Sequence, residues 1–476
     1  MLVRQVADAK LAQFAYLIGC PRTGEAIVID PERDVDRYFD VAARNKLRIV
    51  AAADTHIHAD YLSGLREMAA RGVLVYASKM GGPEWQYEWL LNGKYPHRLL
   101  GHGDQFSVGL IEFRAVHTPG HTPEHLSYLV QDAGGGAEDF IALASGDFVF
   151  VGDVGRPDLL ERAAGMVGVM EPSARAQFAS IQREFRSLPE FLQVWPAHGA
   201  GSACGKSLGD VPTSTVGYEL RTNRSIHAAV DEQTFVDFIL AGQPEPPLYF
   251  ARMKRDNRRG PALLTALPSP PAMHATDLAA LENRRDIAVL DTRSRKAFFE
   301  GHLAGSLLTE LDYQFCSIGG SYVAEDTPVY LVVDESHLHE AVRALIRVGL
   351  DHVAGYITPD TLADYGRQGG QLRHTETIDM GELEMQRTAG RGHVLDVRGA
   401  AEFEAGHVPD ALHVPHTRIG INADTLPTDK PLLVYCNSGA RAAAAVAMLE
   451  RLGLTAIDVN DNFANYRRAD HVAAHA

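Results

Sequence analysis

Histidine and aspartate side chains gather at four places in the first 200 residues. His56, His58 and Asp60 form one dense group, while His121, Asp147 and His198 stand in later segments. Most of these places follow an apolar run that predicts a strand, and α/β sites usually lie at the carboxyl ends of strands. Neutral imidazole and carboxylate are the donors that divalent transition metals take. The sequence therefore predicts a metal site.

A cysteine near the end of the chain predicts a second chemistry. Cys436 ends an apolar run, and Arg441 follows it just before an alanine-rich segment that predicts a helix. Backbone N–H groups of the loop and the positive end of the helix favour a thiolate, and equally the terminal sulfur of a persulfide. Arg441 adds a fixed cation for an anionic substrate. We expect Cys436 to be a nucleophile.

Short strands and helices alternate in the first 250 residues, which predicts a layered α/β or α+β domain. Residues 49–53 are an expected buried strand and 59–71 the helix that follows it. Residues 252–259 form a basic run. We expect this run to be a solvated loop before a linker, with contact to an anion as the alternative.

The last 200 residues contain an internal repeat. Asp291 and Asp396 stand in matching Leu-Asp-x-Arg segments, and each is followed by a matching Gly-His pair at the same spacing. One supersecondary plan is thus used twice. The first copy has no cysteine at the matching position: two alignments place Val332 or Val333 opposite Cys436, and the acidic residues that follow would repel anions. We expect this copy to be inactive.

These observations predict four segments. Their boundaries are 1–256 for the metal-binding domain, 257–272 for the linker, 273–375 for the inactive repeat and 376–476 for the active repeat.

The first segment resembles the metallo-β-lactamase superfamily, whose fold is an αββα sandwich with metals at one edge of two packed sheets. The family's metal-binding pattern falls on His56, His58, Asp60, Tyr61, His121, Asp147 and His198. Tyr61 replaces a histidine of the two-metal members. A neutral phenol with a pKa of ~10 is a poor ligand at neutral pH, so we expect one metal rather than two.

The segments 121–125 and 151–158 resemble the persulfide dioxygenase branch of this superfamily. The resemblance implies one Fe²⁺ per chain, held by His56, His121 and Asp147, with positions left for substrate sulfur and O₂. His58, Asp60, Tyr61 and His198 would then orient ligands or handle protons. Whether His58 also binds the metal stays open.

The last repeat resembles the rhodanese family, with Cys436 in the place of the nucleophile and Arg441 closing the loop. Four residues separate them, which suits a sulfur atom; related phosphatases have five.

Two further residues, both in the first segment, have roles that the sequence leaves open. Arg156 would pair with an anionic substrate group or hold a loop, and Cys204 would relay sulfur near the metal or be a plain loop thiol.

Together, these resemblances imply two α/β rhodanese domains after the sandwich and a two-step activity. A low-molecular-weight thiol persulfide and O₂ give sulfite, and Cys436 passes sulfane sulfur to sulfite to form thiosulfate, which detoxifies sulfide. One alternative is a glyoxalase II-like thioester hydrolase with two metals and an appended sulfurtransferase. The other is a non-catalytic sulfur carrier or sensor.

The composition of the chain excludes some classes of binding partner. The 476-residue chain has a formal charge of −16, which disfavours nucleic acid and anionic lipid as partners. Four cysteines do not make a disulfide framework. Since no secretory leader or long apolar run is present, we expect a cytoplasmic protein with no membrane contact, and a homo-oligomer at this size.

Overall fold

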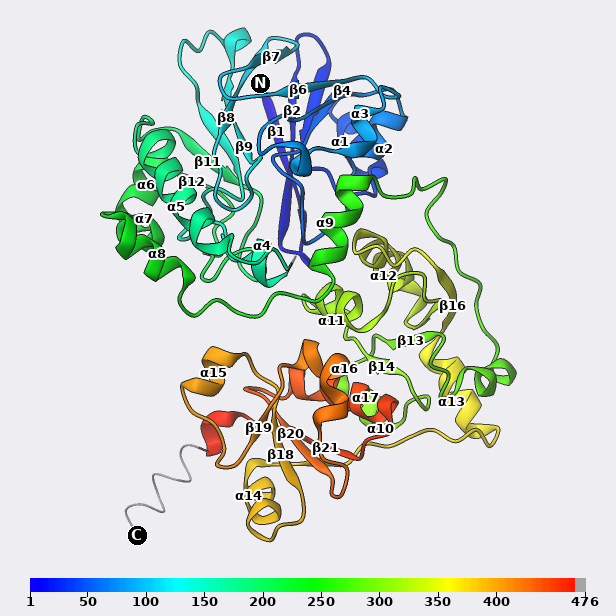
Figure 1. Cartoon of the computed structure of the whole chain (residues 1–476). Helices are drawn as coiled ribbons and strands as arrows, with labels where there is room; N and C mark the ends of the chain where they lie inside the picture. Colours follow the sequence, from blue (N-terminus) through cyan, green and yellow to red (C-terminus); the bar gives the residue numbers. More distant parts are fainter. Residues whose placement is uncertain (164, 467–476) are drawn as a thin grey trace. The chain divides into compact units, whose positions relative to one another are not determined.

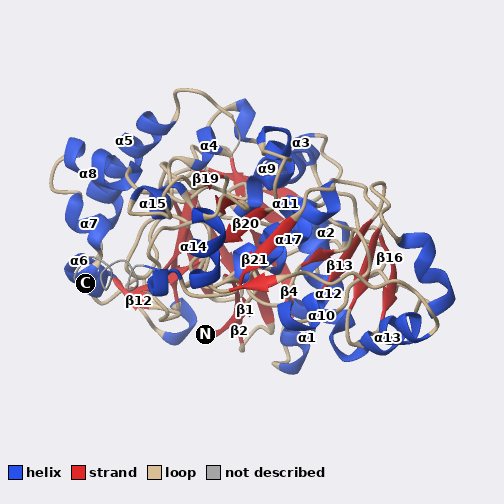
Figure 2. Ribbon diagram, turned by 90° about the horizontal axis from the view of Figure 1, so that it is seen from below, coloured by secondary structure: helices blue, strands red, loops and turns tan. Residues whose placement is uncertain are grey.

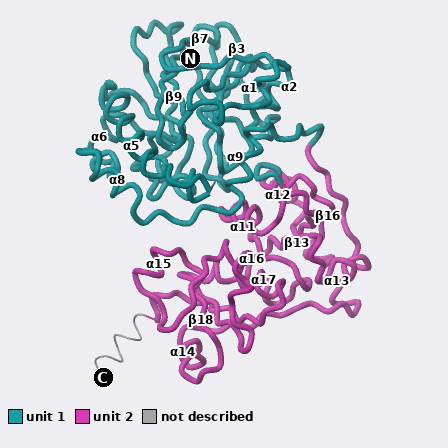
Figure 3. Tube along the Cα trace, in the orientation of Figure 1, with its two compact units in different colours: residues 1–266, 346–349 teal, residues 267–345, 350–476 magenta. Residues whose placement is uncertain are grey.

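A computed structural model describes residues 1–163 and 165–466 and divides the chain into two compact units (Figure 3). The first unit is Met1–Ala266 with Ile346–Gly349, and the second is Leu267–Leu345 with Leu350–Ala476. The division between residues 266 and 267 falls inside the expected linker. The four predicted boundaries stay predictions, and the last of them, at 476, lies outside the described residues.

Two six-stranded sheets form the centre of the first unit (Figure 1). In spatial order, the strands of the first sheet are β1 (Leu2–Asp8), β2 (Gln13–Cys20), β3 (Glu25–Ile29), β4 (Arg48–Ala53), β5 (Leu74–Ser78) and β6 (His97–Leu100). Those of the second are β12 (Ser214–Thr215), β11 (Gln193–Pro196), β10 (Ala142–Gly146), β9 (Leu126–Gln131), β8 (Ile111–His117) and β7 (Gln105–Val108).

Helices cover the outer face of each sheet. They are α1 (Asp36–Arg44), α2 (Leu65–Ala70), α3 (Glu88–Leu91), α4 (Leu159–Arg162), α5 (Met170–Ser180), α6 (Val216–Thr222), α7 (Arg224–Ala228), α8 (Glu232–Leu240) and α9 (Phe250–Arg259), with short turns η1 (Pro83–Trp85), η2 (Ala133–Gly135) and a π-helical turn η3 (Ile181–Phe185). Helices α5 to α8 lie together at one side in both views (Figure 1, Figure 2).

Three apolar layers hold the first unit together. Ile18 and Phe113 are buried between the two sheets. Tyr38 and Met68 pack the first sheet against α1 and α2, and Phe235 packs the second sheet against its helices. Burial of such side chains drives the packing of sheet on sheet and helix on sheet. The unit is therefore the expected helix–sheet–sheet–helix sandwich.

The helix expected over residues 59–71 is shorter, because α2 begins only at Leu65. Backbone groups of the preceding loop bind distant partners: the Gly64 N–H donates to the Pro31 carbonyl and the Tyr61 carbonyl accepts from Asn257, both at 2.7 Å. Groups bound in this way are not available for helical hydrogen bonds. The sequence prediction was wrong here because tertiary contacts decide the start of the helix.

The basic run 252–259 was also predicted wrongly, since it lies within helix α9 and not in a loop. Phe250, Met253 and Asn257 are buried at helical spacing, and the cations between them are partly exposed. Gly260, with φ of +96°, ends the helix. One buried face is enough to make a helix of a segment that is mostly charged.

The second unit contains two parallel sheets, one in each copy of the repeat. The sheet of the middle repeat has the order β14 (Leu307–Leu308), β13 (Ala288–Asp291), β15 (Val329–Val332) and β16 (Val353–Ile357). That of the last repeat has the order β17 (Thr377–Ile378), β21 (Ala456–Val459), β20 (Leu432–Tyr435), β18 (His393–Asp396) and β19 (Leu412–His413).

The helices of the middle repeat are η4 (Ala275–Leu281), α10 (Arg295–Glu300), α11 (Phe315–Tyr322), α12 (Glu335–Arg347) and α13 (Pro359–Arg367). Those of the last repeat are α14 (Met380–Thr388), α15 (Ala400–Glu404), η5 (His416–Arg418), α16 (Ile419–Asn422), η6 (Ala423–Thr425) and α17 (Ala440–Leu452).

The two repeats share their detailed geometry. Arg293 binds Asp291 and donates to the Gly301 carbonyl at 2.8 Å; Arg398 binds Asp396 and donates to the carbonyl of Gly406 at the same distance. In each repeat a phenylalanine ring also stacks on the histidine that follows, with centroids 3.9 and 3.8 Å apart. The repeat read from the sequence is thus present in the structure.

Strand register decides which residue of the middle repeat stands opposite Cys436. Asp291 pairs with Val332, and Asp396 pairs with Tyr435. The next residues, Val333 and Cys436, are therefore equivalent. In the middle repeat α12 begins two residues after Val333, whereas α17 begins four residues after Cys436. The middle repeat consequently lacks both the thiol and the loop.

Among the described residues, no helix has the length and apolar character needed to span a bilayer.

Candidate functional site

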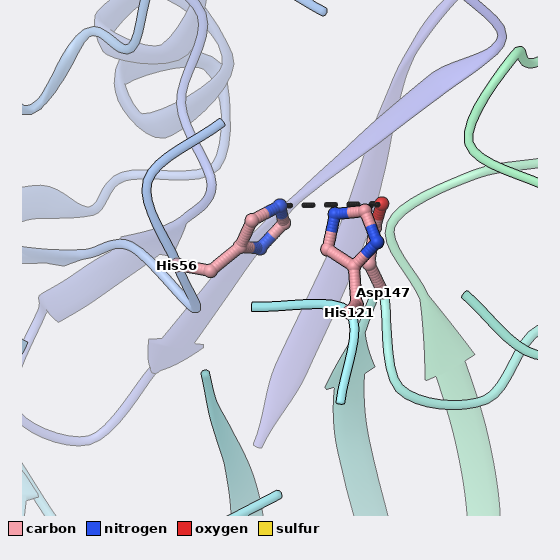
Figure 4. A group of neighbouring side chains, drawn as sticks. All are labelled: His56, His121 and Asp147. Atoms are coloured by element: carbon pink, nitrogen blue, oxygen red, sulfur yellow. Dashed lines mark ion pairs between the residues drawn. The ribbon is translucent and has the colours of Figure 1, made fainter. Parts of the chain in front are cut away.

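Three predicted ligands meet at the end of the sandwich (Figure 4). His56 follows β4, His121 lies in the loop after β8, and Asp147 comes directly after β10. One ligand atom of each lies within 4.8 Å of the others. Asp147 Oδ2 is 3.4 Å from His121 Nε2 and 4.0 Å from His56 Nε2. The three side chains could hold one metal ion between them.

Neighbouring groups orient all three ligands. The Nδ1 of His121 lies 3.0 Å from the Arg156 carbonyl and that of His56 lies 2.9 Å from the hydroxyl of Thr55, which leaves both Nε2 atoms for the centre. The backbone N–H of Asp147 donates to His125 at 3.0 Å. Such outer contacts fix ring orientation and tautomer around metals.

The chemistry of this donor set fits a divalent metal. His56 Nε2 and both carboxylate oxygens of Asp147 are buried without a hydrogen-bond partner in the described structure. Burial lowers the pKa of His121 to about 3, so its ring is neutral and able to bind metal. Burial also raises the pKa of Asp147 to about 6. Buried polar atoms of this kind need a partner, and a cation supplies it.

A second group of donors lies close by. One ligand atom each of Asp60, His198 and Cys204 fall within 4.8 Å of one another, and His198 Nε2 is 3.3 Å from Asp60 and 3.5 Å from Asp147. Cys204 is buried, and burial followed by the charges of Asp60 and Asp147 raises the pKa of its thiol well above the usual value. The structure thus brings Cys204 to the metal pocket.

His58 packs on the ring of His56, with centroids 4.2 Å apart, but its polar contacts are with Tyr61 and Asp30. His58 Nε2 lies 3.3 Å from Asp30 and 3.1 Å from the Tyr61 hydroxyl, while its Nδ1 has no hydrogen-bond partner in the described residues. Burial lowers the pKa of His58, but the hydrogen bond to Asp30 and the charges of Asp30 and its acidic neighbours outweigh it and raise this pKa to about 9. Burial raises the pKa of Tyr61, which stays a neutral phenol.

Arg156 is fully buried, and its donors are taken up within the protein. It binds Asp158 through two nitrogens at 3.1 and 2.8 Å and donates to the carbonyls of Ala203 and Pro244. Of the two roles left open by the sequence, these contacts favour the holding of a loop. They also tie the segment around Cys204 to the pocket.

The Cys436 loop has the geometry that the sequence suggests. Cys436 follows β20 directly and is buried, and its sulfur accepts the backbone N–H of Gly439 at 3.1 Å. Gly439 has φ of +90°, so the loop turns at a residue without a side chain. Arg441 lies in the first turn of α17 and makes a two-pronged ion pair with Glu402 at 2.6 and 2.8 Å.

Sequence reasoning missed three residues at these sites. His125 is not among the predicted site residues, yet its Nε2 accepts the Asp147 N–H. Asn257 donates to the carbonyls of His58 and Tyr61, and Glu402 pairs with Arg441. The spacing of His121 and His125 was a signal for the first. Nothing in the sequence indicates the other two, because their partners are 39 or more residues away.

Comparisons with known proteins agree with this geometry. The sequence matches the family "Metallo-beta-lactamase superfamily" over residues 9–198 and the family "Rhodanese-like domain" over residues 379–468. A metallo-beta-lactamase structure from Staphylococcus aureus is 39% identical with a TM-score of 0.67, and the match covers 75% of this chain and 99% of that one.

Two curated relatives differ in activity. A mitochondrial persulfide dioxygenase of Bos taurus is 28% identical over 42% of this chain and 68% of its own length. A hydroxyacylglutathione hydrolase of Actinobacillus pleuropneumoniae is 29% identical over 38% of this chain and 65% of its own length. The chain belongs to the metallo-β-lactamase superfamily and carries a rhodanese domain at its C-terminal end.

Proposed function

We propose that the chain oxidises a low-molecular-weight thiol persulfide with O₂ to sulfite, using one Fe²⁺, and that Cys436 transfers sulfane sulfur to sulfite. The observation that carries this proposal is the His56–His121–Asp147 group on the same chain as the Cys436 loop. The similarity to persulfide dioxygenases and the match to the rhodanese family support it.

His56 and Asp147 would hold the metal through atoms that lack partners, and His121 through its Nε2, since its Nδ1 contacts the Arg156 carbonyl. A ferrous ion held by two imidazoles and one carboxylate supplies open coordination positions for sulfur and O₂. The chain contributes the fixed ligand directions, through the Arg156 carbonyl and His125, and a buried pocket. Overall, one persulfide, one O₂ and one water give one thiol, one sulfite and two protons.

The sulfur transfer at Cys436 proceeds in two displacements. The Cys436 thiolate attacks the outer sulfur of a persulfide, the sulfur–sulfur bond breaks, and the thiol leaves. Sulfite then attacks the terminal sulfur of the Cys436 persulfide, forming thiosulfate and restoring the thiolate. The Gly439 N–H at 3.1 Å from the sulfur is positioned to stabilise negative charge in both forms.

A two-metal thioester hydrolase is the second candidate. The Asp60–His198–Cys204 group and the similarity to hydroxyacylglutathione hydrolases favour it. The neutral Tyr61 phenol, whose hydroxyl contacts Gln13, Asp30 and His58, speaks against a second ion.

Metal content and O₂ uptake separate the two candidates. Protein purified without oxygen should contain one iron per chain and should consume O₂ when glutathione persulfide or coenzyme A persulfide is added. Two metals per chain, thioester hydrolysis and a flat oxygen-electrode trace would support the hydrolase instead.

A further inference from the structure

Cations make up half of the residues that line a cavity of about 330 Å³ in the first unit. Its lining includes Lys254, Arg255, Arg258 and Arg259 of helix α9, together with Glu84 and Trp85. Because the whole chain has a formal charge of −16, four cations around one cavity are a local reversal of charge. We call this set of six residues the cationic pocket.

Helix α9 is fixed to the loop that carries His56 and His58. Asn257, on its buried face, donates to the carbonyls of His58 and Tyr61 at 2.8 and 2.7 Å and accepts the N–H of Ser63 at 2.8 Å. The cations precede and follow Asn257 on the same helix by one turn or less. The cationic pocket is therefore held at a set position relative to the loop that carries His56 and His58.

The wall of the pocket that contains Trp85 packs on a second loop with a predicted metal ligand. The Lys254 ammonium lies 3.5 Å from the centroid of the Trp85 ring. A Cβ built at Gly81 would lie 2.9 Å from both the Trp85 Cβ and the Glu124 nitrogen, so this wall packs on the loop of His121. Glu124 in turn accepts the Ile57 N–H at 2.8 Å. Both walls thus contact loops that carry predicted metal ligands.

The cations of the pocket are only partly neutralised. Arg255 pairs with Asp256 at 2.7 Å and Arg258 with Glu88 at 2.7 Å. Arg259 is exposed, and no ion pair of its guanidinium occurs in the described part of the chain. Guanidinium groups bind phosphate and carboxylate through two parallel hydrogen bonds. The face of Trp85 offers an apolar surface beside them.

We propose that the cationic pocket binds the anionic end of the thiol substrate, away from its sulfur. The proposal rests on the proposed function and specifies its substrate class: a persulfide of a thiol that carries phosphate or carboxylate groups. Coenzyme A and glutathione represent the two sources of such charge. The cations hold the charged end while the sulfur reaches toward His56, His121 and Asp147.

Binding of the unreactive thiols tests the pocket without turnover. Coenzyme A and glutathione are titrated calorimetrically into the full chain and into the variants Arg258→Gln and Arg259→Gln. Each variant should raise the Kd of the better-bound thiol about tenfold, since a charge-assisted hydrogen bond is lost. Arg44→Gln, at an exposed site on α1, is the matched control and should leave Kd unchanged. Equal affinities in all variants, or no binding of either thiol to the unaltered chain, would overturn the proposal.

Steady-state kinetics separate the failure of the pocket from failure of the proposed function. With a charged persulfide, the two variants should raise KM and leave kcat of O₂ uptake within twofold. With the uncharged persulfide of 2-mercaptoethanol they should change neither constant. Weaker thiol binding in the variants without O₂ uptake in any of them would retain the pocket and refute the dioxygenase. O₂ uptake at the normal rate in the variants, with unchanged KM for the charged persulfide, would refute the pocket and retain the dioxygenase.

Discussion

The guanidinium of Arg295 donates to the backbone carbonyl of Ser438 at 2.8 Å. Arg295 begins helix α10 of the middle repeat, and Ser438 lies in the loop between Cys436 and Arg441. A Cβ placed on Gly439 would clash with the same guanidinium, so the loop and the arginine are closely packed. The middle repeat, which has Val333 in the place of Cys436, therefore holds the loop of the last repeat.

Removal of this contact should slow sulfur transfer. In Arg295→Gln the Ser438 carbonyl loses a charged donor, and transfer of sulfur to sulfite should fall about tenfold, the equivalent of one charge-assisted hydrogen bond. O₂ uptake with a thiol persulfide should not change. Lys296→Gln, at the exposed neighbouring position, is the control. Undiminished thiosulfate formation in Arg295→Gln would show that the contact does not position the loop.

Replacement of Cys436 by serine should separate the two reactions. A hydroxyl cannot carry a persulfide, so Cys436→Ser should form sulfite and consume O₂ but make no thiosulfate. Ion chromatography of both products checks this. Cys316→Ser, at a buried cysteine in α11, serves as control and should keep both activities. Thiosulfate made by Cys436→Ser at the normal rate would exclude Cys436 as the carrier.

Loss of the Asp147 carboxylate should empty the metal site. Asp147 lies between His56 and His121, and two neutral imidazoles alone bind a divalent ion weakly. Asp147→Ala should therefore lose its iron, measured by elemental analysis, together with O₂ uptake. Asp139→Ala, at an exposed position, should retain both. Stoichiometric iron in Asp147→Ala would refute the ligand assignment.

The Tyr61 position should control the number of metals. Tyr61→His places an imidazole beside Asp60, where it can complete a second site with His198. We expect elemental analysis of this variant to find up to two metals per chain after incubation with Zn²⁺, against one for the unaltered chain. Tyr61→Phe is the control and should stay at one. Equal metal content in all three would mean that Tyr61 does not set the number.

Asp458 should make the second unit less stable as pH rises. Burial raises the pKa of this carboxyl to about 7, although Arg295 opposes the shift, and neither oxygen has a hydrogen-bond partner in the described residues. Its pKa in the unfolded chain is ~3.9, so the folded state holds the extra proton between these values. This stabilising contribution is complete below pH ~4 and is lost as pH rises through 7.

Asp458→Asn tests this linkage. The variant should have a higher melting temperature than the unaltered chain at pH 8, by roughly 1–3 kcal/mol in free energy of unfolding. The advantage should shrink at pH 5, as followed by scanning calorimetry of the full chain. Asp424→Asn, at an exposed site, should show no such trend. If the melting temperature of Asp458→Asn exceeded that of the unaltered chain equally at both pH values, the stabilisation would come from packing and not from the pKa of Asp458.

The sequence alone determined the features that depend on local pattern and on residue type. The two copies of the repeat follow from matching segments, and their shared Arg–Asp geometry is present in the structure. The predicted metal ligands are recognisable because few functions require imidazoles and carboxylates after successive strands. Their convergence to within 4.8 Å then follows from the topology of the sandwich.

Only the tertiary structure decided the helix boundaries and residue equivalences that depend on contacts with distant segments. Helix α2 starts only at Leu65 because Asn257 binds backbone groups of the preceding loop, almost 200 residues away. Helix α9 forms because one face of a mostly charged segment is buried. The equivalence of Val333 with Cys436 required the pairing of strands, since two alignments of the sequence were equally good. Hydrogen bonds and burial between remote segments outweigh local propensity at such positions, and a linear pattern does not contain them.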